Sequence, residues 1–223
     1  MKNFNGKVAV ITGAGSGLGR EFADRAAELG MKLVLADVQA DALERATDAL
    51  LGQGVEVLSM VCDVSKSSHV QELADAAMAR FHGIHLVFNN AGVGSGGLIW
   101  ENTEADWEWV LGVNLWGVIH GVRIFTPLML DCGRRDPSYR GHIVNTASMA
   151  GQGAARVARQ AVLALTETLH QELRESGAPV GASVLCPEEL PAWVPADIAG
   201  IAFDTIRRGA LRIVAPDARR QGA

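Results

Sequence analysis

The sequence of 223 residues predicts an α/β domain, a doubly wound parallel sheet with helices on both faces. Two observations lead to this fold class. Short apolar runs rich in β-branched residues alternate along the chain with segments whose apolar residues recur at helical spacing. Glycines or polar residues directly follow several of these runs, at the sheet edge where parallel α/β folds bind ligands. The length favours a single domain over residues 1–223, with enough chain for a substantial core.

The first element is a predicted strand over residues 7–11, followed by a glycine-rich loop and a helix that carries Phe22 and Ala26 on its apolar face. The glycines follow G-x-x-x-G-x-G rather than G-x-G-x-x-G. Backbone without Cβ atoms at a helix N-terminus admits a pyrophosphate, although a merely flexible loop is the alternative. The candidate cofactor-binding residues here are Thr12, Gly13, Gly15, Ser16, Gly17, Leu18 and Gly19.

The second predicted strand, residues 32–37, ends on Asp37, about 20 residues past the glycine loop. A carboxylate there accepts hydrogen bonds from both hydroxyls of an adenosine ribose and repels a 2′-phosphate. Its expected neighbours, Ser16 and Val38, supply no cation for that phosphate. The sequence therefore favours NAD over NADP as cofactor, the alternative being that Asp37 only caps the next helix.

The remaining elements continue the alternation of strand and helix. A helix carries Asn114 within its apolar stripe, so this amide must bond a backbone group, a water or a ligand. A surface loop is predicted over residues 131–141, and Ser148 follows the fifth strand. The predicted strands cover residues 55–61, 84–88, 142–147, 180–186 and 211–214, and the helices residues 43–50, 70–81, 107–122, 161–176 and 198–207.

Composition and charge exclude several classes of partner. The net charge of −5, with no basic run, argues against nucleic acid and anionic membranes. No apolar stretch is expected to approach a membrane span, and the first residues do not resemble a signal peptide. The scattered Cys62, Cys132 and Cys186 indicate reduced thiols in a cytoplasmic protein. His82 and His85 lack metal-site spacing, so no metal site is predicted.

Taken in order, these motifs resemble those of the short-chain dehydrogenase/reductase family, from Gly6 to Val214. The resemblance implies a Rossmann-like domain with strand order 3-2-1-4-5-6-7, assembled as a homodimer or homotetramer. It also implies NAD(P)-dependent hydride transfer between a small-molecule alcohol and a ketone or aldehyde. Ser148 and Asn114 match the family's catalytic residues. Cofactor contacts are implied for Asp63 on the adenine side, and further for Val64, Asn90, Ala91, Gly92, Arg159 and Pro187.

In the family, a Ser hydroxyl donates to the substrate carbonyl, a Tyr transfers the proton, and a Lys holds the ribose and lowers the Tyr pKa. An Asn positions a water at the end of this relay. The sequence departs from the pattern because no Y-x-x-x-K follows Ser148: alignment places Ala155 at the Tyr position and Arg159 at the Lys position. Arg159 supplies charge but no acid–base chemistry near neutral pH. Tyr139 precedes the fifth strand, roughly 20 Å from Ser148 at about 3.3 Å per residue, and is rejected.

The chain is also shortened near residues 151–156 and 187–196, both on the rim of the expected active site. There are two explanations. Either this is a non-catalytic NAD-binding relative, acting as a sensor or assembly subunit, or the sequence is contracted, meaning that residues of mobile loops in the natural protein are missing from it. The second explanation is favoured, because a natural deletion would have to join the two new chain ends without strain and a contracted sequence has no such requirement. Residues 94–100 are expected to line the substrate pocket, and the helices bearing Trp107 and Leu169 to form the contact between subunits.

Overall fold

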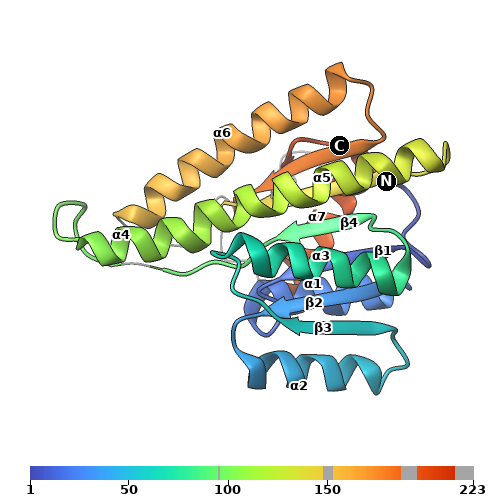
Figure 1. The fold of residues 1–223 in the computed structure, drawn as a ribbon, viewed down its shortest axis with the longest axis horizontal. Helices are drawn as coiled ribbons and strands as arrows, with labels where there is room; N and C mark the ends of the chain where they lie inside the picture. The colour runs from blue at the N-terminus through green and yellow to red at the C-terminus, as the bar shows by residue number, and fades with distance from the viewer. Residues whose placement is uncertain (95, 148–152, 187–194, 214–223) are drawn as a thin grey trace, which may run out of the picture.

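A seven-stranded parallel sheet of order β3-β2-β1-β4-β5-β6-β7 forms the centre of the molecule (Figure 1). The structure, a computed structural model, describes residues 1–94, 96–147, 153–186 and 195–213. The predicted fold class and strand order are therefore confirmed. The strands are β1 (Val8–Thr12), β2 (Lys32–Asp37), β3 (Val57–Val61), β4 (Leu86–Asn89), β5 (Gly141–Thr146), β6 (Val180–Leu185) and β7 (Arg212–Ile213).

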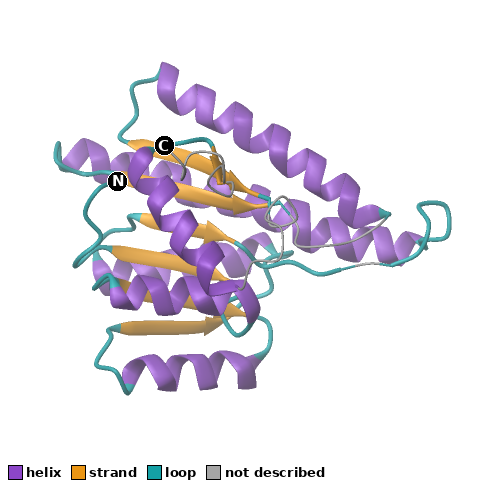
Figure 2. Ribbon diagram, turned by 180° about the vertical axis from the view of Figure 1, so that it is seen from behind, coloured by secondary structure: helices purple, strands orange, loops and turns teal. Residues whose placement is uncertain are grey.

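Helices cover both faces of the sheet (Figures 1 and 2). One core cluster joins one face of the sheet to α1, α2 and α7, and a second joins the other face to α3, α5 and α6. Burial on both faces explains why the strands read as continuous apolar runs. The helices are α1 (Gly17–Glu28), α2 (Ala40–Leu51), α3 (Ser67–Phe81), α4 (Glu104–Leu111), α5 (Gly117–Arg135), α6 (Ala154–Glu175) and α7 (Pro195–Arg208).

The segment from α4 to α5 differs from the predicted uninterrupted helix. A π-helical turn, η1 (Gly112–Trp116), separates the two and contains Asn114. π-Helical turns inside helices are frequent at functional sites because they change the register of the side chains. In Figure 1, α4 and the start of α6 extend beyond the edge of the sheet at which the strands end.

The prediction of a surface loop over residues 131–141 is wrong for its first part, since α5 continues to Arg135. The polar composition that suggested a loop belongs to the last helical turn, where Arg134 and Arg135 each pair with Asp131 at 2.9 and 3.0 Å. Cations at a helix C-terminus also interact favourably with the helix dipole. Tyr139 lies beyond the helix, is buried, and donates its hydroxyl hydrogen bond to the Ile84 carbonyl, so its rejection as the catalytic acid is confirmed.

By length and composition alone, the 32 residues Glu104–Arg135 are long and apolar enough to cross a membrane. This corrects the expectation that no apolar stretch approaches that length. Such evidence is weak, because core helices of folded proteins meet the same criterion. Here the apolar side of α5, including the fully buried Phe125 and Met129, packs against the sheet and α3, which accounts for part of its composition.

Candidate functional site

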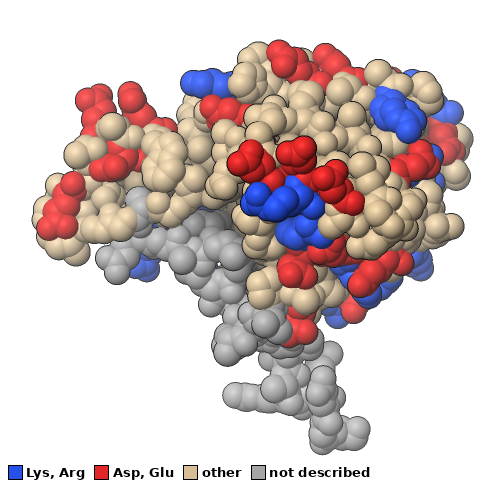
Figure 3. Space-filling model, turned by 90° about the horizontal axis from the view of Figure 1, so that it is seen from below, with Lys and Arg blue, Asp and Glu red and all other residues tan. Residues whose placement is uncertain are grey.

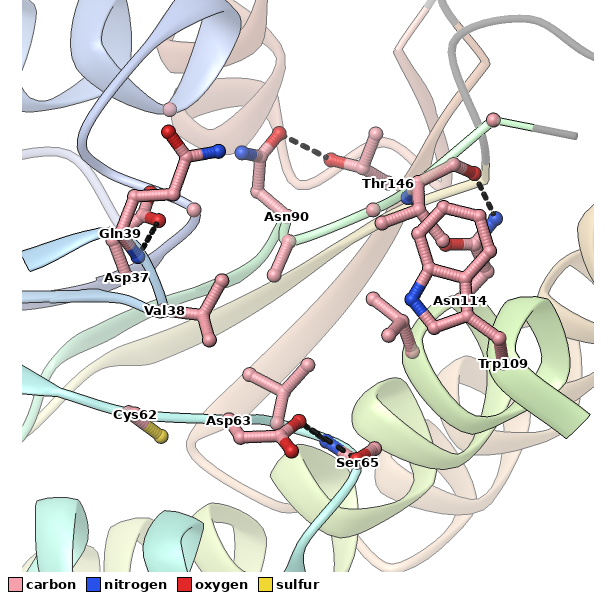
Figure 4. A pocket seen from close by; sticks show the side chains of 18 of the residues that line it. Asp37, Val38, Gln39, Cys62, Asp63, Ser65, Asn90, Trp109, Asn114 and Thr146 are labelled. Carbon is pink, nitrogen blue, oxygen red and sulfur yellow. Dashed lines mark hydrogen bonds between the residues drawn. The ribbon is translucent and has the colours of Figure 1, made fainter. Parts of the chain in front are cut away.

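A cavity of about 930 Å³ lies at the edge where the strands end (Figure 4). Its walls come from the segments that follow β1, β2, β3 and β4, together with α4, η1 and the end of β5. This is the position at which parallel α/β sheets bind ligands. The described lining residues are Gly13, Ser16, Gly17, Leu18, Gly19, Asp37, Val38, Gln39, Cys62, Asp63, Val64, Ser65, Lys66, Asn90, Ala91, Gly92, Val93, Gly94, Ala105, Glu108, Trp109, Val113, Asn114 and Thr146.

The glycine loop has no space for side chains at two of its positions. Gly13 has a φ of 68°, and a Cβ there would lie 2.9 Å from the Ala91 Cα. A Cβ on Gly19 would lie 2.0 Å from the Gly13 carbonyl oxygen. Glycine is therefore required for the backbone of the loop to approach α1 and the segment after β4 this closely.

The N-terminus of α1 faces the cavity through Ser16, Gly17 and Leu18. Within the described part of the chain, no side chain caps this first turn, and it contains no acidic residue. Its backbone N–H groups and the positive end of the helix dipole are thus available to an anion. This arrangement fits the diphosphate of a dinucleotide.

Asp37 connects the end of β2 to the glycine loop. Its carboxylate accepts a hydrogen bond from the Gly15 N–H at 2.9 Å and another from the Gln39 N–H at 2.9 Å. Asp37 and Val38 line the cavity, as expected for residues that meet an adenosine ribose. Gly15 lies behind the lining.

Thr12 also lies behind the lining and ties the segment after β4 to β1. Its hydroxyl donates to the Phe88 carbonyl at 3.2 Å and accepts from the Asn90 and Ala91 N–H groups at 2.9 and 3.1 Å. Asn90 donates its amide to the Thr12 carbonyl at 3.1 Å and accepts from the Thr146 hydroxyl at 3.1 Å. These bonds hold Asn90, Ala91 and Gly92 beside the cavity.

Asp63 and Val64 form another wall, in the loop that joins β3 to α3. The Asp63 carboxylate accepts from the Ser65 hydroxyl at 2.7 Å and from the Ser65 N–H at 3.0 Å. Burial opposes ionisation of Asp63, but these two hydrogen bonds and the charge of Lys66 outweigh it and lower the pKa of the carboxyl group. Asp63 is therefore held as a carboxylate at neutral pH.

Asn114 is buried, and its side-chain amide bonds both the backbone N–H and the backbone carbonyl of Val93. The side-chain oxygen accepts from the Val93 N–H at 2.8 Å, and the side-chain nitrogen donates to the Val93 carbonyl at 2.7 Å. The predicted need for a hydrogen-bond partner is confirmed, and the partner is backbone. Asn114 thus fixes the segment that leaves β4 over the cavity.

The structure describes only part of the region in which the catalytic residues are expected. Ser148 and Pro187 lie outside the described residues, as do most of the positions where the shortening was predicted. Ala155, at the position of the family's Tyr, is buried in the first turn of α6 against Val110 of α4. Arg159 lies one turn further along α6, outside the described lining of the cavity.

Several lining residues were missed by sequence reasoning. Gln39, Ser65 and Lys66 lie in the loops that follow the predicted strands 32–37 and 55–61, so their position was the signal that could have identified them. Trp109 lies one turn before Val113 on the helix that carries Asn114, and 53% of its surface is exposed. Its position beside the cavity depends on how α4 packs, which no local pattern reveals. Cys62, Val93, Ala105, Glu108, Val113 and Thr146 were likewise not proposed, whereas Gly94 belongs to the stretch 94–100 that was expected to line the substrate pocket.

Comparison with known proteins identifies relatives along most of the chain. Residues 7–191 match the family model described as short chain dehydrogenase. A 1-deoxy-11-beta-hydroxypentalenate dehydrogenase from Streptomyces avermitilis is 40% identical over 187 residues, which cover 80% of this chain and 67% of that protein. The chain spans about two thirds of the length of the curated relatives that it matches.

Two solved structures with bound cofactor are similar. A short-chain dehydrogenase/reductase from Burkholderia phymatum in complex with NAD has a TM-score of 0.88 and 40% identity, covering 96% of this chain and 90% of that one. A metagenomic short-chain oxidoreductase in complex with NADP has a TM-score of 0.83 and 28% identity, covering 95% of this chain and 97% of that one. Both nicotinamide cofactors therefore occur among proteins of this fold.

Proposed function

Because this chain belongs to the short-chain dehydrogenase/reductase family of NAD(P)-dependent oxidoreductases, we propose that it transfers hydride between NAD and a small-molecule alcohol or carbonyl compound. The relatives cited above are dehydrogenases or oxidoreductases by name, which supports an enzyme and gives no support to the non-catalytic alternative. The observation that carries the proposal is the cavity formed by the glycine loop, the uncapped start of α1 and Asp37.

The bound nicotinamide would supply the hydride acceptor or donor. The chain itself would bind the diphosphate through the N–H groups of the first turn of α1 and the ribose hydroxyls through Asp37. Asp63 and Val64 would contact the adenine, and Asn90 would support the nicotinamide half. Exclusion of side chains at Gly13 and Gly19 keeps this surface open.

NAD is proposed over NADP on the charges around the cavity. The Asp37 carboxylate would repel a 2′-phosphate. Lys66 is the one Lys or Arg among the described lining residues, and it belongs to the Asp63 loop rather than to the Asp37 turn. Calorimetric titration with NAD and NADP tests this proposal.

The variant Asp37→Asn should raise the NADP-to-NAD affinity ratio at least about tenfold, because about 1.4 kcal/mol of lost repulsion and lost ribose bonding corresponds to that factor. Asp41→Asn, which removes an acidic residue from the first turn of the neighbouring α2, is the matched control and should leave the ratio unchanged. A parent protein that prefers NADP would contradict the assignment.

For the chemical step, Ser148 is proposed to stabilise negative charge on the substrate oxygen, and Asn114 to support the proton relay through the Val93 segment.

The printed sequence holds no Tyr and Lys pair to move the proton. Without general acid–base catalysis, turnover should be lower by about 10²–10⁴. Peptide mapping of the natural protein decides between the two interpretations: additional residues near 151–156 or 187–196 mean that the sequence is contracted there, and turnover of secondary alcohols should then be readily measured.

An apolar substrate and a homo-oligomeric assembly are also proposed. Leu98, Ile99 and Trp100, which follow the segment after β4, are exposed apolar residues suited to an apolar substrate. Trp109 and Trp116, on the helical segment predicted to join subunits, expose about half of their surface. Light scattering tests the assembly, and a monomer would contradict it.

A cytoplasmic location and the lack of a nucleic-acid partner remain proposals too. The three cysteines are buried thiols, which suits a reducing compartment. On the face seen in Figure 3, Lys and Arg side chains are interspersed with Asp and Glu rather than gathered into a basic patch. The net charge of −5 also argues against a nucleic-acid partner. Fractionation and a DNA-binding assay at low salt test the two points.

A further inference from the structure

The backbone N–H of Asp63 is bonded by a side chain rather than by the sheet. The preceding N–H, that of Cys62, completes the ladder between β2 and β3 by donating to the Asp37 carbonyl at 2.9 Å. Asp63 then leaves the sheet, and among the described residues no backbone carbonyl accepts its N–H. The acceptor is Nδ1 of His69, at 3.3 Å. A side chain further along the chain therefore fixes the Asp63 backbone.

His69 lies in the first turn of α3 and is partly buried. Because a backbone N–H can only donate, Nδ1 accepts, and the neutral ring carries its proton on Nε2. Two further bonds join the same residues: the His69 N–H donates to the Lys66 carbonyl at 3.1 Å, and the Lys66 N–H donates to the Asp63 carbonyl at 3.0 Å. Together the three bonds close the loop of residues 63–69 on itself.

The closed loop presents Asp63 to the cavity. The Asp63 carboxylate accepts from the N–H and the hydroxyl of Ser65 at 3.0 and 2.7 Å, as Figure 4 shows. Asp63, Val64, Ser65 and Lys66 line the cavity at the wall assigned to the adenine, whereas His69 is not among the described lining residues. His69 thus acts on a ligand at this wall through the Asp63 backbone and not by direct contact.

We propose that His69 is a positioning residue for the adenine end of the dinucleotide, its Nδ1 holding the Asp63 backbone so that Asp63 and Val64 form the adenine wall. This inference rests on the proposed function, because it assumes that the cavity binds NAD. A histidine that only stabilised α3 would affect unfolding without changing cofactor affinity. A positioning residue changes the affinity for NAD and for its adenosine half, and leaves the hydride-transfer step nearly unchanged.

The test compares the parent with His69→Leu and His69→Asn by calorimetric titration with NAD and with AMP, and by steady-state kinetics where turnover is measurable. His69→Leu removes the acceptor and should weaken both ligands by the same factor, about three- to tenfold, as expected for one lost hydrogen bond. The Michaelis constant for NAD should rise with little change in kcat. His69→Asn carries its Oδ1 acceptor on Cγ, as the histidine carries Nδ1, and should keep most of the affinity.

The order of the two variants separates positioning from helix stability. Leu is the better helix former, so an effect on α3 alone would favour His69→Leu over His69→Asn, the reverse of the expected order. If His69→Leu does not fold, His69→Ala takes its place in the same comparison.

His170→Leu is the matched control. His170 is another partly buried imidazole whose Nδ1 bonds a backbone group, the Ala182 carbonyl at 2.8 Å, and it lies outside the described lining of the cavity. Its replacement should leave the affinities for NAD and AMP unchanged.

The outcomes separate the two proposals. A parent that binds neither NAD nor NADP overturns the proposed function and this inference together. Where the parent binds NAD, equal affinity of His69→Leu, or a His69→Asn variant that binds no better than His69→Leu, overturns the role of His69 alone. A loss of affinity for NAD without a matching loss for AMP contradicts it, as does a fall in kcat with an unchanged Michaelis constant for NAD.

Discussion

Replacement of Gly19 by Ala tests the close packing of the cofactor loop directly. The added Cβ would lie 2.0 Å from the Gly13 carbonyl oxygen, 2.7 Å from the Gly13 carbonyl carbon and 2.8 Å from the Asn90 side-chain nitrogen. Real Cβ contacts are not shorter than 3.0 Å, so the loop and α1 must separate by about 1 Å. Because the nearest atoms are backbone, no side-chain rotation relieves the clash.

Overpacking of this kind costs about 1–3 kcal/mol of folding free energy. In a chain of this length that corresponds to a fall in melting temperature of about 2–4 °C for each kcal/mol. The effect on the cofactor should be of similar size, because a misplacement of about 1 Å in an active site costs up to about a hundredfold, which corresponds to about 3 kcal/mol. We therefore expect Gly19→Ala to remain folded and to lose most NAD affinity.

Thermal unfolding and calorimetric titration with NAD measure the two effects. Gly200→Ala is the matched control, because a Cβ on this residue of α7 meets nothing within 4 Å. Alanine is favoured over glycine inside a helix, so this variant should be more stable by about 1 kcal/mol and bind NAD as the parent does. A Gly19→Ala protein with the parent's melting temperature and NAD affinity would refute the packing described for the loop.

Three further measurements test other parts of the site and core. Asn114→Leu leaves the N–H and carbonyl of Val93 without their partners, so the free energy of unfolding in urea should fall by about 1–3 kcal/mol; an unchanged value would contradict the pairing. Burial lowers the pKa of His142 to about 3, whereas the unfolded chain titrates near pH 6.5. The unfolded state therefore binds the extra proton, and this residue's contribution should be complete above about pH 6.5 and fall by about 1.4 kcal/mol per pH unit towards pH 3. His142→Leu should flatten that part of the pH–stability curve, and an equal slope in both proteins would be evidence against it. Burial and nearby carboxylates raise the pKa of the Cys62 thiol to about 11, so alkylation by iodoacetamide at pH 8 should be about two orders of magnitude slower than that of a small thiol, and rapid only after unfolding.

The limits of sequence reasoning follow from the range of the interactions concerned. Strand β2 was predicted with its observed ends, because a buried parallel strand is marked by local composition alone. The end of α5 was misplaced because Arg134, Arg135 and Asp131 look the same in a loop and in the last turn of a helix. The π-helical turn at Asn114 was not foreseen, since its register depends on the Val93 peptide group that the side chain bonds.

The sequence by itself determined the order of strands and helices, the glycine loop and the acidic end of β2, because apolar periodicity and the backbone freedom of glycine are local properties. Only the tertiary structure left Thr12 and Gly15 out of the described cavity lining and brought Trp109 and Ser65 into it. These positions arise where segments far apart in the chain pack together. Close approach at Gly117 and hydrogen bonds to backbone groups decide such packing, and neither leaves a periodic pattern in the sequence.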